Sequence, residues 1–144
     1  MCLFVDDTVK LPETLTDEGG EYFIGYKLLS VISYTKKLIS IWSYYLYKVG
    51  WNIANGRKEV FTDYNEQTEI SSGYIHLYLK HDEALNDKTK YELGDRIVVP
   101  VKCYVKDVAF IGKNHIYSTG TSDGACVKQV FLEESDYNNA IGAE

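Results

Sequence analysis

Hydrophobic and polar residues alternate along four segments of this chain, with the period of two that predicts β-strands. These segments are 21–33, 38–51, 73–80 and 96–106. A short polar turn at 34–37 joins the first two, so we expect them to form a hairpin. Two further strands are predicted at 58–62, after an Asn-Gly turn, and at 125–133, after an Asp-Gly turn. The pattern therefore predicts a mostly antiparallel sheet of five or six strands.

One segment has the character of a helix instead of a strand. Residues 81–93 carry two acidic side chains in the first turn, where the helix dipole favours negative charge. Ala84, Leu85 and Tyr91 form its candidate buried stripe. One main helix packed on an antiparallel sheet defines the α+β class. We therefore expect an α+β fold with this single main helix.

The length of the chain indicates one domain. Its 144 residues contain no Pro-, Gly- or Ser-rich seam, and single domains usually have about 100 to 150 residues. Within this single domain, 1–144, we expect residues 1–20 to form an irregular lead-in and residues 134–144 to form a frayed tail. The longest apolar run, 38–47, has about half the length of a membrane-spanning helix, so we expect a soluble protein that is not secreted.

Composition and charge narrow the class of function. Hydrophobic residues make up 45% of the chain and charged residues 25%, which are globular proportions and argue against intrinsic disorder. The net charge of −6 argues against nonspecific binding to a nucleic acid polymer but allows a local site for an anion. Three cysteines without a CxxC spacing favour reduced thiols, and hence a cytosol, over a disulfide framework.

Tyrosine is frequent, with 13 residues in a chain whose aromatic content is 14%. Because tyrosine combines a broad ring with a directional hydroxyl, one interpretation is a surface that recognises a ligand or a partner. The alternative is that tyrosine only fills half-exposed strand positions, for which it has a high propensity. With Trp42 and Trp51 around one turn, we expect more exposed aromatic surface than a monomer tolerates, and therefore a homodimer or a larger homo-oligomer.

Familiar catalytic and cofactor motifs are absent from the sequence. The chain has no GxGxxG, no GxxxxGK[ST] and no HExxH motif. His76 and His81 fall on a strand and on the following helix, which disfavours a zinc site. Cys103 and Cys126 lie in apolar strands that favour buried thiols, and residues 118–124 fit either a nest of backbone amides for an anion or a simple hairpin loop. We predict no catalytic residue, no metal site and no cofactor.

One predicted sheet face carries groups that suit a nucleotide. If segments 73–80 and 96–106 lie in one sheet, their polar sides gather rings and cations. The candidate ligand-binding residues are Tyr74, His76, Tyr78, Lys102, Tyr104, Lys106, Arg96 and Arg57. The tyrosines would stack on a base, the lysines and an arginine would meet a diphosphate, and the histidine would bond to a ribose hydroxyl. The alternative is that these side chains simply alternate out to solvent.

Several short motifs give a resemblance that covers residues 22–133. They are Gly25-Tyr26-Lys27, Tyr47-x-x-Gly50, Gly73-x-Ile75-His76-x-Tyr78 running into Glu83-Ala84, Val99-Pro100-Val101-Lys102-Cys103, Asp107-Val108-Ala109, and the closing ACVKQVFL from Ala125. This set resembles small uncharacterised phage and viral proteins and is similar to the phage anti-Thoeris sponge family. The resemblance implies a non-enzymatic homo-oligomer in the host bacterial cytoplasm. Such a protein encloses a cyclic ADP-ribose isomer and so blocks TIR-dependent (Thoeris) defence.

Two other functions stay open on the same residues. The Gly-x-Ile-His-x-Tyr strand and a late glutamate also resemble a degenerate ADP-ribosyltransferase, in which His76 would hold a ribose and Glu133 or Glu134 would polarise its hydroxyl. The third function is that of a structural or host-protein-binding viral accessory protein. A sequestering protein would release its ligand unchanged, a transferase would consume dinucleotide, and an interaction protein would do neither.

Overall fold

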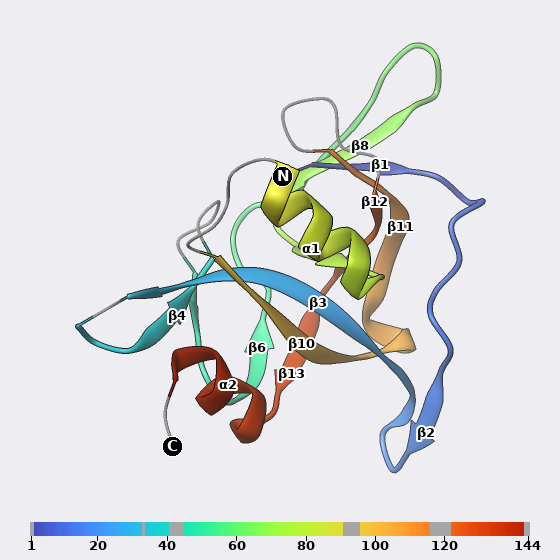
Figure 1. Ribbon diagram of the computed structural model, residues 1–144. Coiled ribbons are helices and arrows are strands. Elements are labelled where there is room, and N and C mark those ends of the chain that lie inside the picture. The colour runs from blue at the N-terminus through green and yellow to red at the C-terminus, as the bar shows by residue number, and fades with distance from the viewer. Residues whose placement is uncertain (1, 33, 41–44, 91–95, 116–121, 143–144) are drawn as a thin grey trace.

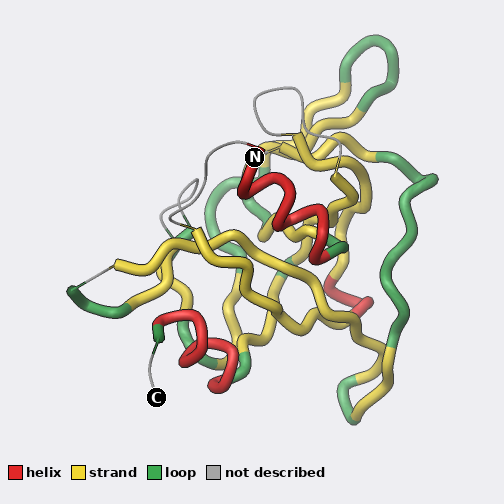
Figure 2. Tube along the Cα trace, viewed as in Figure 1, coloured by secondary structure: helices red, strands yellow, loops and turns green. Residues whose placement is uncertain are grey.

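The computed structural model describes residues 2–32, 34–40, 45–90, 96–115 and 122–142. Within these ranges, thirteen strands belong to one antiparallel sheet, accompanied by two short α-helices and one turn of 3-10 helix (Figure 1). Figure 2 shows how much of the trace is strand. None of the described helices has the length and the apolar character that crossing a membrane requires.

The strands follow one another through most of the chain. Their bounds are β1 Cys2–Val5, β2 Leu15–Asp17, β3 Gly20–Ile32, β4 Lys37–Ile39, β5 Leu46–Tyr47, β6 Gly50–Ile53, β7 Glu59–Thr62, β8 Thr68–Ser72, β9 Ile75–Tyr78, β10 Arg96–Tyr104, β11 Val108–His115, β12 Ser122–Val127 and β13 Gln129–Leu132. The helices are α1 His81–Lys90, the 3-10 helix η1 Val105–Asp107 and α2 Glu134–Ile141.

Strand β3 lies at the centre of the sheet. The strand order is β6-β13-β10-β3-β9-β12-β11-β1-β8-β7, with β2 and β4 also paired to β3, and β5 paired to β4. Tyr26 of β3 lies opposite Pro100 of β10 on one side and opposite Tyr78 of β9 on the other. Because β3 is rich in strand-forming residues and has no proline, it can pair along both edges. Strands β9 and β10 therefore share the sheet but are separated by β3.

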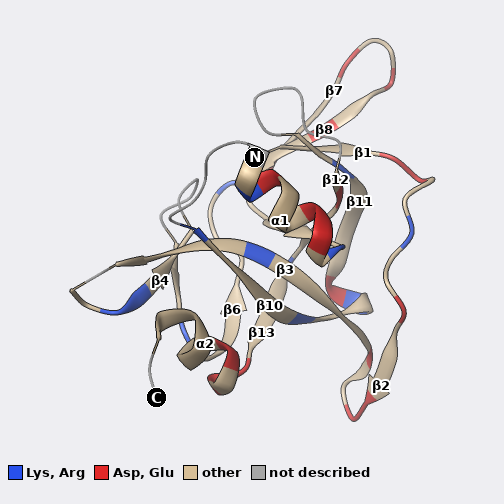
Figure 3. Cartoon of the chain, in the orientation of Figure 1, with Lys and Arg blue, Asp and Glu red and all other residues tan. Residues whose placement is uncertain are grey.

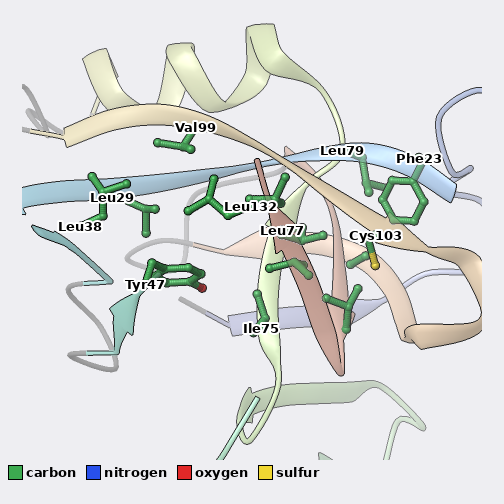
Figure 4. Packing of buried hydrophobic residues seen from close by; sticks show 14 of the residues in the cluster. Phe23, Leu29, Leu38, Tyr47, Ile75, Leu77, Leu79, Val99, Cys103 and Leu132 are labelled. Atoms are coloured by element: carbon green, nitrogen blue, oxygen red, sulfur yellow. The ribbon is translucent and has the colours of Figure 1, made fainter. Parts of the chain in front are cut away.

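The main hydrophobic core lies on one face of this curved sheet (Figure 4). Alternate strand residues build it, and Leu29 of β3, Leu77 of β9 and Val99 of β10 have almost no exposed surface. Burying a side chain of this size stabilises a fold by about 1.5–3 kcal/mol. Tyr47 of β5 belongs to the same cluster, on the side of Leu29 in Figure 4. The core therefore extends to the strand that borders the candidate site described below.

A smaller cluster on the opposite face is covered by α1. Ala84 of the helix packs with Leu28 of β3 and Tyr78 of β9, and all three residues are buried. A backbone amide of β12, that of Asp123, donates to the Glu83 carboxylate of α1 at 2.9 Å. Strand β9 is thus covered on both faces, and all four of its residues are buried.

The predicted fold class, an α+β domain of five or six strands with one main helix, is wrong. The described residues form thirteen strands and only two short helices, so the protein is mostly antiparallel sheet. Segment 38–51, expected to be one strand, contains β4, β5 and the start of β6, and the chain enters β6 at Gly50 with a φ of 96°. Strands of two to four residues carry too little alternation to be recognised in the sequence.

Both ends of the chain are also more regular than the sequence indicates. The expected lead-in, 1–20, contains β1 and β2, and Leu3 is buried in the sheet between β11 and β8. The expected frayed tail, 134–144, contains α2, whose Tyr137 packs on the main core and which ends at Gly142 in the left-handed conformation, with a φ of 76°. Helix α1 begins at His81 as predicted, whereas residues 91–93 of the expected helix lie outside the described residues.

Candidate functional site

A cavity of about 420 Å³ opens beside the main core. Its described walls come from β3, from β5, from the chain between 54 and 59, and from the connection between β8 and β9, which are far apart in the sequence. Six side chains give this space most of its chemistry: Lys27, Tyr45, Tyr47, Arg57, Tyr74 and His76. We call it the Lys27 cavity.

Lys27 sets the electrostatics of the Lys27 cavity. It lies in the middle of β3, is 7% exposed, and its Nζ donates a hydrogen bond to the backbone oxygen of His76 at 2.8 Å. Among the described residues, no carboxylate forms an ion pair with it. Burial removes hydration from the ammonium and lowers the pKa of Lys27 to about 8. At neutral pH the cavity wall therefore carries a buried cation that has no ion-pair partner among the described residues, although Glu59 also lines the cavity.

Three tyrosines supply aromatic walls. Tyr45 and Tyr47 meet edge to face, with ring centroids 5.0 Å apart. Tyr74 packs edge to face on Phe110 at 5.7 Å, and Nζ of Lys58 lies 5.3 Å from the centre of its ring. Burial raises the pKa of Tyr47, so its phenol stays protonated and can donate a hydrogen bond. Tyr45 and Tyr74 are half-buried and offer apolar ring surface, whereas Tyr47 is 3% exposed and belongs to the main core.

His76 is buried beside Lys27 and is neutral. Burial first, and then the positive charge of Lys27, lower the pKa of His76 to about 3. Its Nδ1 lies 3.5 Å from the Sγ of Cys126, whose pKa is raised by burial, so this thiol stays protonated. Burial likewise raises the pKa of Cys103 to about 12. The predicted burial of both cysteines is confirmed, and the raised pKa values keep both thiols protonated at neutral pH.

The polar rim of the Lys27 cavity forms where the turn before β9 passes close to the segment that carries Arg57. Gly73 has a φ of 88°, and a Cβ built there would lie 2.4 Å from the Cα of Lys58. Only glycine therefore lets the turn before β9 meet the segment that carries Arg57. Ser72 Oγ donates to the backbone oxygen of Arg57 at 3.0 Å and ties the two segments together. The exposed Arg57 adds a second positive charge at the rim, beside Glu59.

The eight residues predicted from the sequence fall into three places. Arg57, Tyr74 and His76 line the Lys27 cavity. Lys102, Tyr104 and Lys106 lie together at a different site, around β2 and the end of β10. Tyr78 and Arg96 are buried, and Tyr78 lies beneath α1. The separation follows from the topology, because β3 lies between the two strands that were expected to present one common face.

The second of these groups is occupied by its own contacts. Lys102 forms an ion pair with Asp17 of β2, and the hydroxyl of Tyr104 donates to the same carboxylate at 2.8 Å. Lys106 lies 5.2 Å from the ring centre of Tyr104, and Trp51 stacks on that ring with centroids 5.8 Å apart. Figure 3 shows a basic position in the middle of β3, away from the acidic turn beside β2. We call Asp17, Lys102 and Tyr104, with Lys106 and Trp51 packed around them, the Asp17 cluster. It holds β2 against the sheet, and the charge of Lys102 is already paired with Asp17.

Replacing Asp17 by asparagine is expected to loosen β2 without affecting the Lys27 cavity. The hydrogen bond from Lys102, ahead of other causes, holds the pKa of Asp17 below its usual range, so its contribution is present above about pH 4 and is lost as the pH falls. Hydrogen exchange of the amides of residues 15–22 should become several-fold faster in the variant. Unchanged exchange there would mean that the Asp17 cluster does not hold β2.

Sequence reasoning missed Lys27, Tyr45 and Tyr47. Lys27 is the one charge between 22 and 32 of an apolar strand, between Tyr26 and Leu28, and this placement is a usable signal for a buried polar site. The two tyrosines alternate correctly along segment 38–51, but nothing in that pattern indicates which faces enclose a cavity. Trp42 and residues 118–121, considered above for the aromatic surface and for the anion nest, lie outside the described residues.

The described residues contain no group of three or more His, Cys, Asp or Glu side chains placed to hold a metal ion. His81, considered with His76 as a candidate zinc ligand, meets Tyr26 edge to face at the start of α1. Glu133 and Glu134 are exposed at the start of α2, and neither lines the Lys27 cavity with His76. Comparisons of the chain with family models, with curated proteins and with solved structures gave no match.

Proposed function

We propose that the Lys27 cavity binds a small, ring-bearing anion and holds it without chemical change. The observation that carries this proposal is the buried Lys27, which has no ion-pair partner among the described residues and lies in a wall shared with three tyrosines. A buried charge is costly unless something compensates it. An anionic ligand would supply that compensation.

The other cavity residues favour a nucleotide over a simple inorganic anion. A tyrosine ring can stack on any nucleobase, and each such contact contributes about 1 to 3 kcal/mol of binding free energy. Arg57 adds a second cation at the rim, as a diphosphate requires. The volume of about 420 Å³ falls within the range of small-molecule sites. The net charge of the whole chain, −6, would repel a long nucleic acid but leaves room for a single small ligand at a locally basic site.

The sequence resemblance gives the finer form of the proposal. We infer that the ligand is a cyclic ADP-ribose isomer and that the protein, in the cytoplasm of an infected bacterium, sequesters it from TIR-dependent defence. Sequestration needs affinity and slow release but no turnover. This inference rests on the phage-type motifs quoted above, and the cavity supports it only through the class of ligand that it would accept.

Incubation with cyclic ADP-ribose isomers tests both the general proposal of a bound anion and the finer proposal of a cyclic ADP-ribose isomer. The protein is mixed with each isomer, freed of unbound ligand by gel filtration and heated, and the released small molecules are identified by mass spectrometry. We expect one isomer to be released intact from the wild type, to be lost from Lys27→Met, and to be retained by Lys10→Met, an exposed control. A parallel incubation with a nicotinamide dinucleotide tests the alternatives: its consumption would favour a transferase, and absence of both binding and consumption would favour an accessory interaction protein.

We also propose a homodimer, and an exposed aromatic row supports it. Trp51, Phe131, Lys102 and Ile24 are cross-strand neighbours on β6, β13, β10 and β3, and Trp51 and Ile24 are exposed. A second copy could cover the exposed apolar surface of Trp51 and Ile24. Sedimentation at micromolar concentration should show a dimer for the wild type and for Tyr64→Glu, and the 16.4 kDa monomer for Trp51→Glu. A wild type that sediments only as the monomer contradicts the proposal.

A further inference from the structure

The amine of Lys27 is placed as a nucleophile would be. Its one hydrogen bond among the described residues goes to a backbone carbonyl oxygen, to which a neutral amine can also donate. The side chain lies in the wall of a cavity and not in a sealed core.

We propose that Lys27 is a covalent site, at which Nζ forms an imine with an aldehyde or ketone small enough to enter the Lys27 cavity. The three tyrosines of the wall suit a carbonyl compound that carries a ring. This reaction needs the cavity and the amine but no nucleotide, so it goes beyond the proposed function and does not depend on it.

The reaction joins one amine to one carbonyl group and releases one water molecule. The lone pair of neutral Nζ forms a bond to the carbonyl carbon, while the π electrons of the carbonyl move to oxygen. A proton passes from nitrogen to that oxygen and gives a carbinolamine. Its hydroxyl then takes up a proton and leaves as water as the C=N bond forms, and the nitrogen gives up its remaining proton. Protons and electrons balance without an oxidant or a reductant.

Water, and not His76 or Tyr47, carries the protons of this reaction. The ionisable groups near Lys27 come from several elements and are His76 of β9, Cys126 of β12, Tyr45 and Tyr47 at β5, and Arg57 and Glu59 of the outer wall. Burial lowers the pKa of His76 to about 3, which makes it a weak base at pH 7. Burial raises the pKa of Tyr47, which makes its phenol a weak acid that can donate a hydrogen bond but not a proton.

The ionisation of Lys27 makes the reaction selective. Because burial lowers its pKa to about 8, about a tenth of the amine is neutral at pH 7. A lysine in water has a pKa of about 10.4, so fewer than about one in a thousand is neutral at that pH. Lys27 should therefore react with a carbonyl compound faster than the exposed lysines of the same chain.

Reductive trapping tests the proposal on the unmodified protein. The folded wild type is treated at pH 7 with pyridoxal, a ring-bearing aldehyde, and with sodium cyanoborohydride, which reduces the imine to a stable amine. Peptide mass spectrometry then measures the modification at Lys27 and at the exposed Lys10 and Lys36. We expect Lys27 to be modified at least about tenfold faster than either comparison residue. The preference should vanish in 8 M urea, where burial is lost.

Modification of Lys27 at or below the rate of Lys10 in the folded protein overturns the proposal. A Lys27→Arg variant serves as a second check. Modification of the exposed lysines should be unchanged, and total modification should fall by the amount measured at Lys27 in the wild type. Nucleotide binding is measured separately on untreated protein. Loss of trapping with retained nucleotide binding removes this inference alone, and trapping without nucleotide binding removes the proposed function alone.

Discussion

Replacing Lys27 by methionine is expected to make the protein more stable while abolishing its capture of an anion. Burial lowers the pKa of Lys27 from 10.5 to about 8, and each unit of such a shift corresponds to about 1.4 kcal/mol. The charged lysine therefore costs the fold on the order of 3 kcal/mol at neutral pH, a cost that methionine does not have. Ligand affinity should fall at least about tenfold because a charge-assisted hydrogen bond is lost.

The pH dependence of stability distinguishes this effect from improved packing. Between pH 8 and 10.5 the unfolded wild type binds more protons at Lys27 than the folded protein does, so the stability of the wild type rises through this window. The advantage of Lys27→Met should be largest below pH 8 and should shrink toward pH 10.5. Urea denaturation at pH 7 and pH 10 measures the difference in unfolding free energy between Lys27→Met and the wild type, with Lys10→Met as the exposed control. A Lys27→Met protein that is less stable than the wild type at pH 7 contradicts the account.

Replacing Tyr78 by alanine is expected to destabilise the fold by about 3–5 kcal/mol, the usual effect of removing a large buried ring. Tyr78 is 1% exposed and packs with Leu28 and Ala84 between the sheet and α1. Urea denaturation measures the loss. Tyr78→Phe keeps the ring and should remain folded, and its ligand affinity should be unchanged because Tyr78 does not line the Lys27 cavity.

The Tyr78 variants also decide between two roles for this ring. From the sequence, Tyr78 was a candidate to stack on a base. A Tyr78→Ala protein that keeps its stability and loses ligand would restore that role and would contradict the packing described here. Loss of stability, together with normal binding by Tyr78→Phe, assigns the ring to the core.

Alternation predicted the strands whose two faces differ, and it failed where both faces are covered. In the predicted strand 73–80, Ile75, Leu77 and Leu79 alternate with polar residues, and all three lie in the core. Their neighbours His76 and Tyr78 were expected on an open face, but α1 and the neighbouring strands bury them. Coverage of the second face depends on packing between distant segments, which a local period does not contain.

The candidate site was only partly predictable for the same reason. Arg57, Tyr74 and His76 were candidates for their chemistry, and the structure brings these three together. Lys27 and Tyr47 complete the cavity from β3 and β5, which the fold, and not their sequence spacing, places beside β9. The one local signal was the charge of Lys27 within an apolar strand, because such a residue must be compensated after folding.

The most direct test of the central claim is the titration of Lys27 itself, followed by NMR of lysine side chains with and without ligand. Lys27→Arg assigns the signal. Without ligand, the Lys27 signal should titrate near pH 8, because burial lowers its pKa. Saturating cyclic ADP-ribose isomer should move that titration upward, because a bound anion stabilises the ammonium. A ligand that binds tightly and leaves the titration of Lys27 unchanged would contradict the claim that the Lys27 cavity is the binding site.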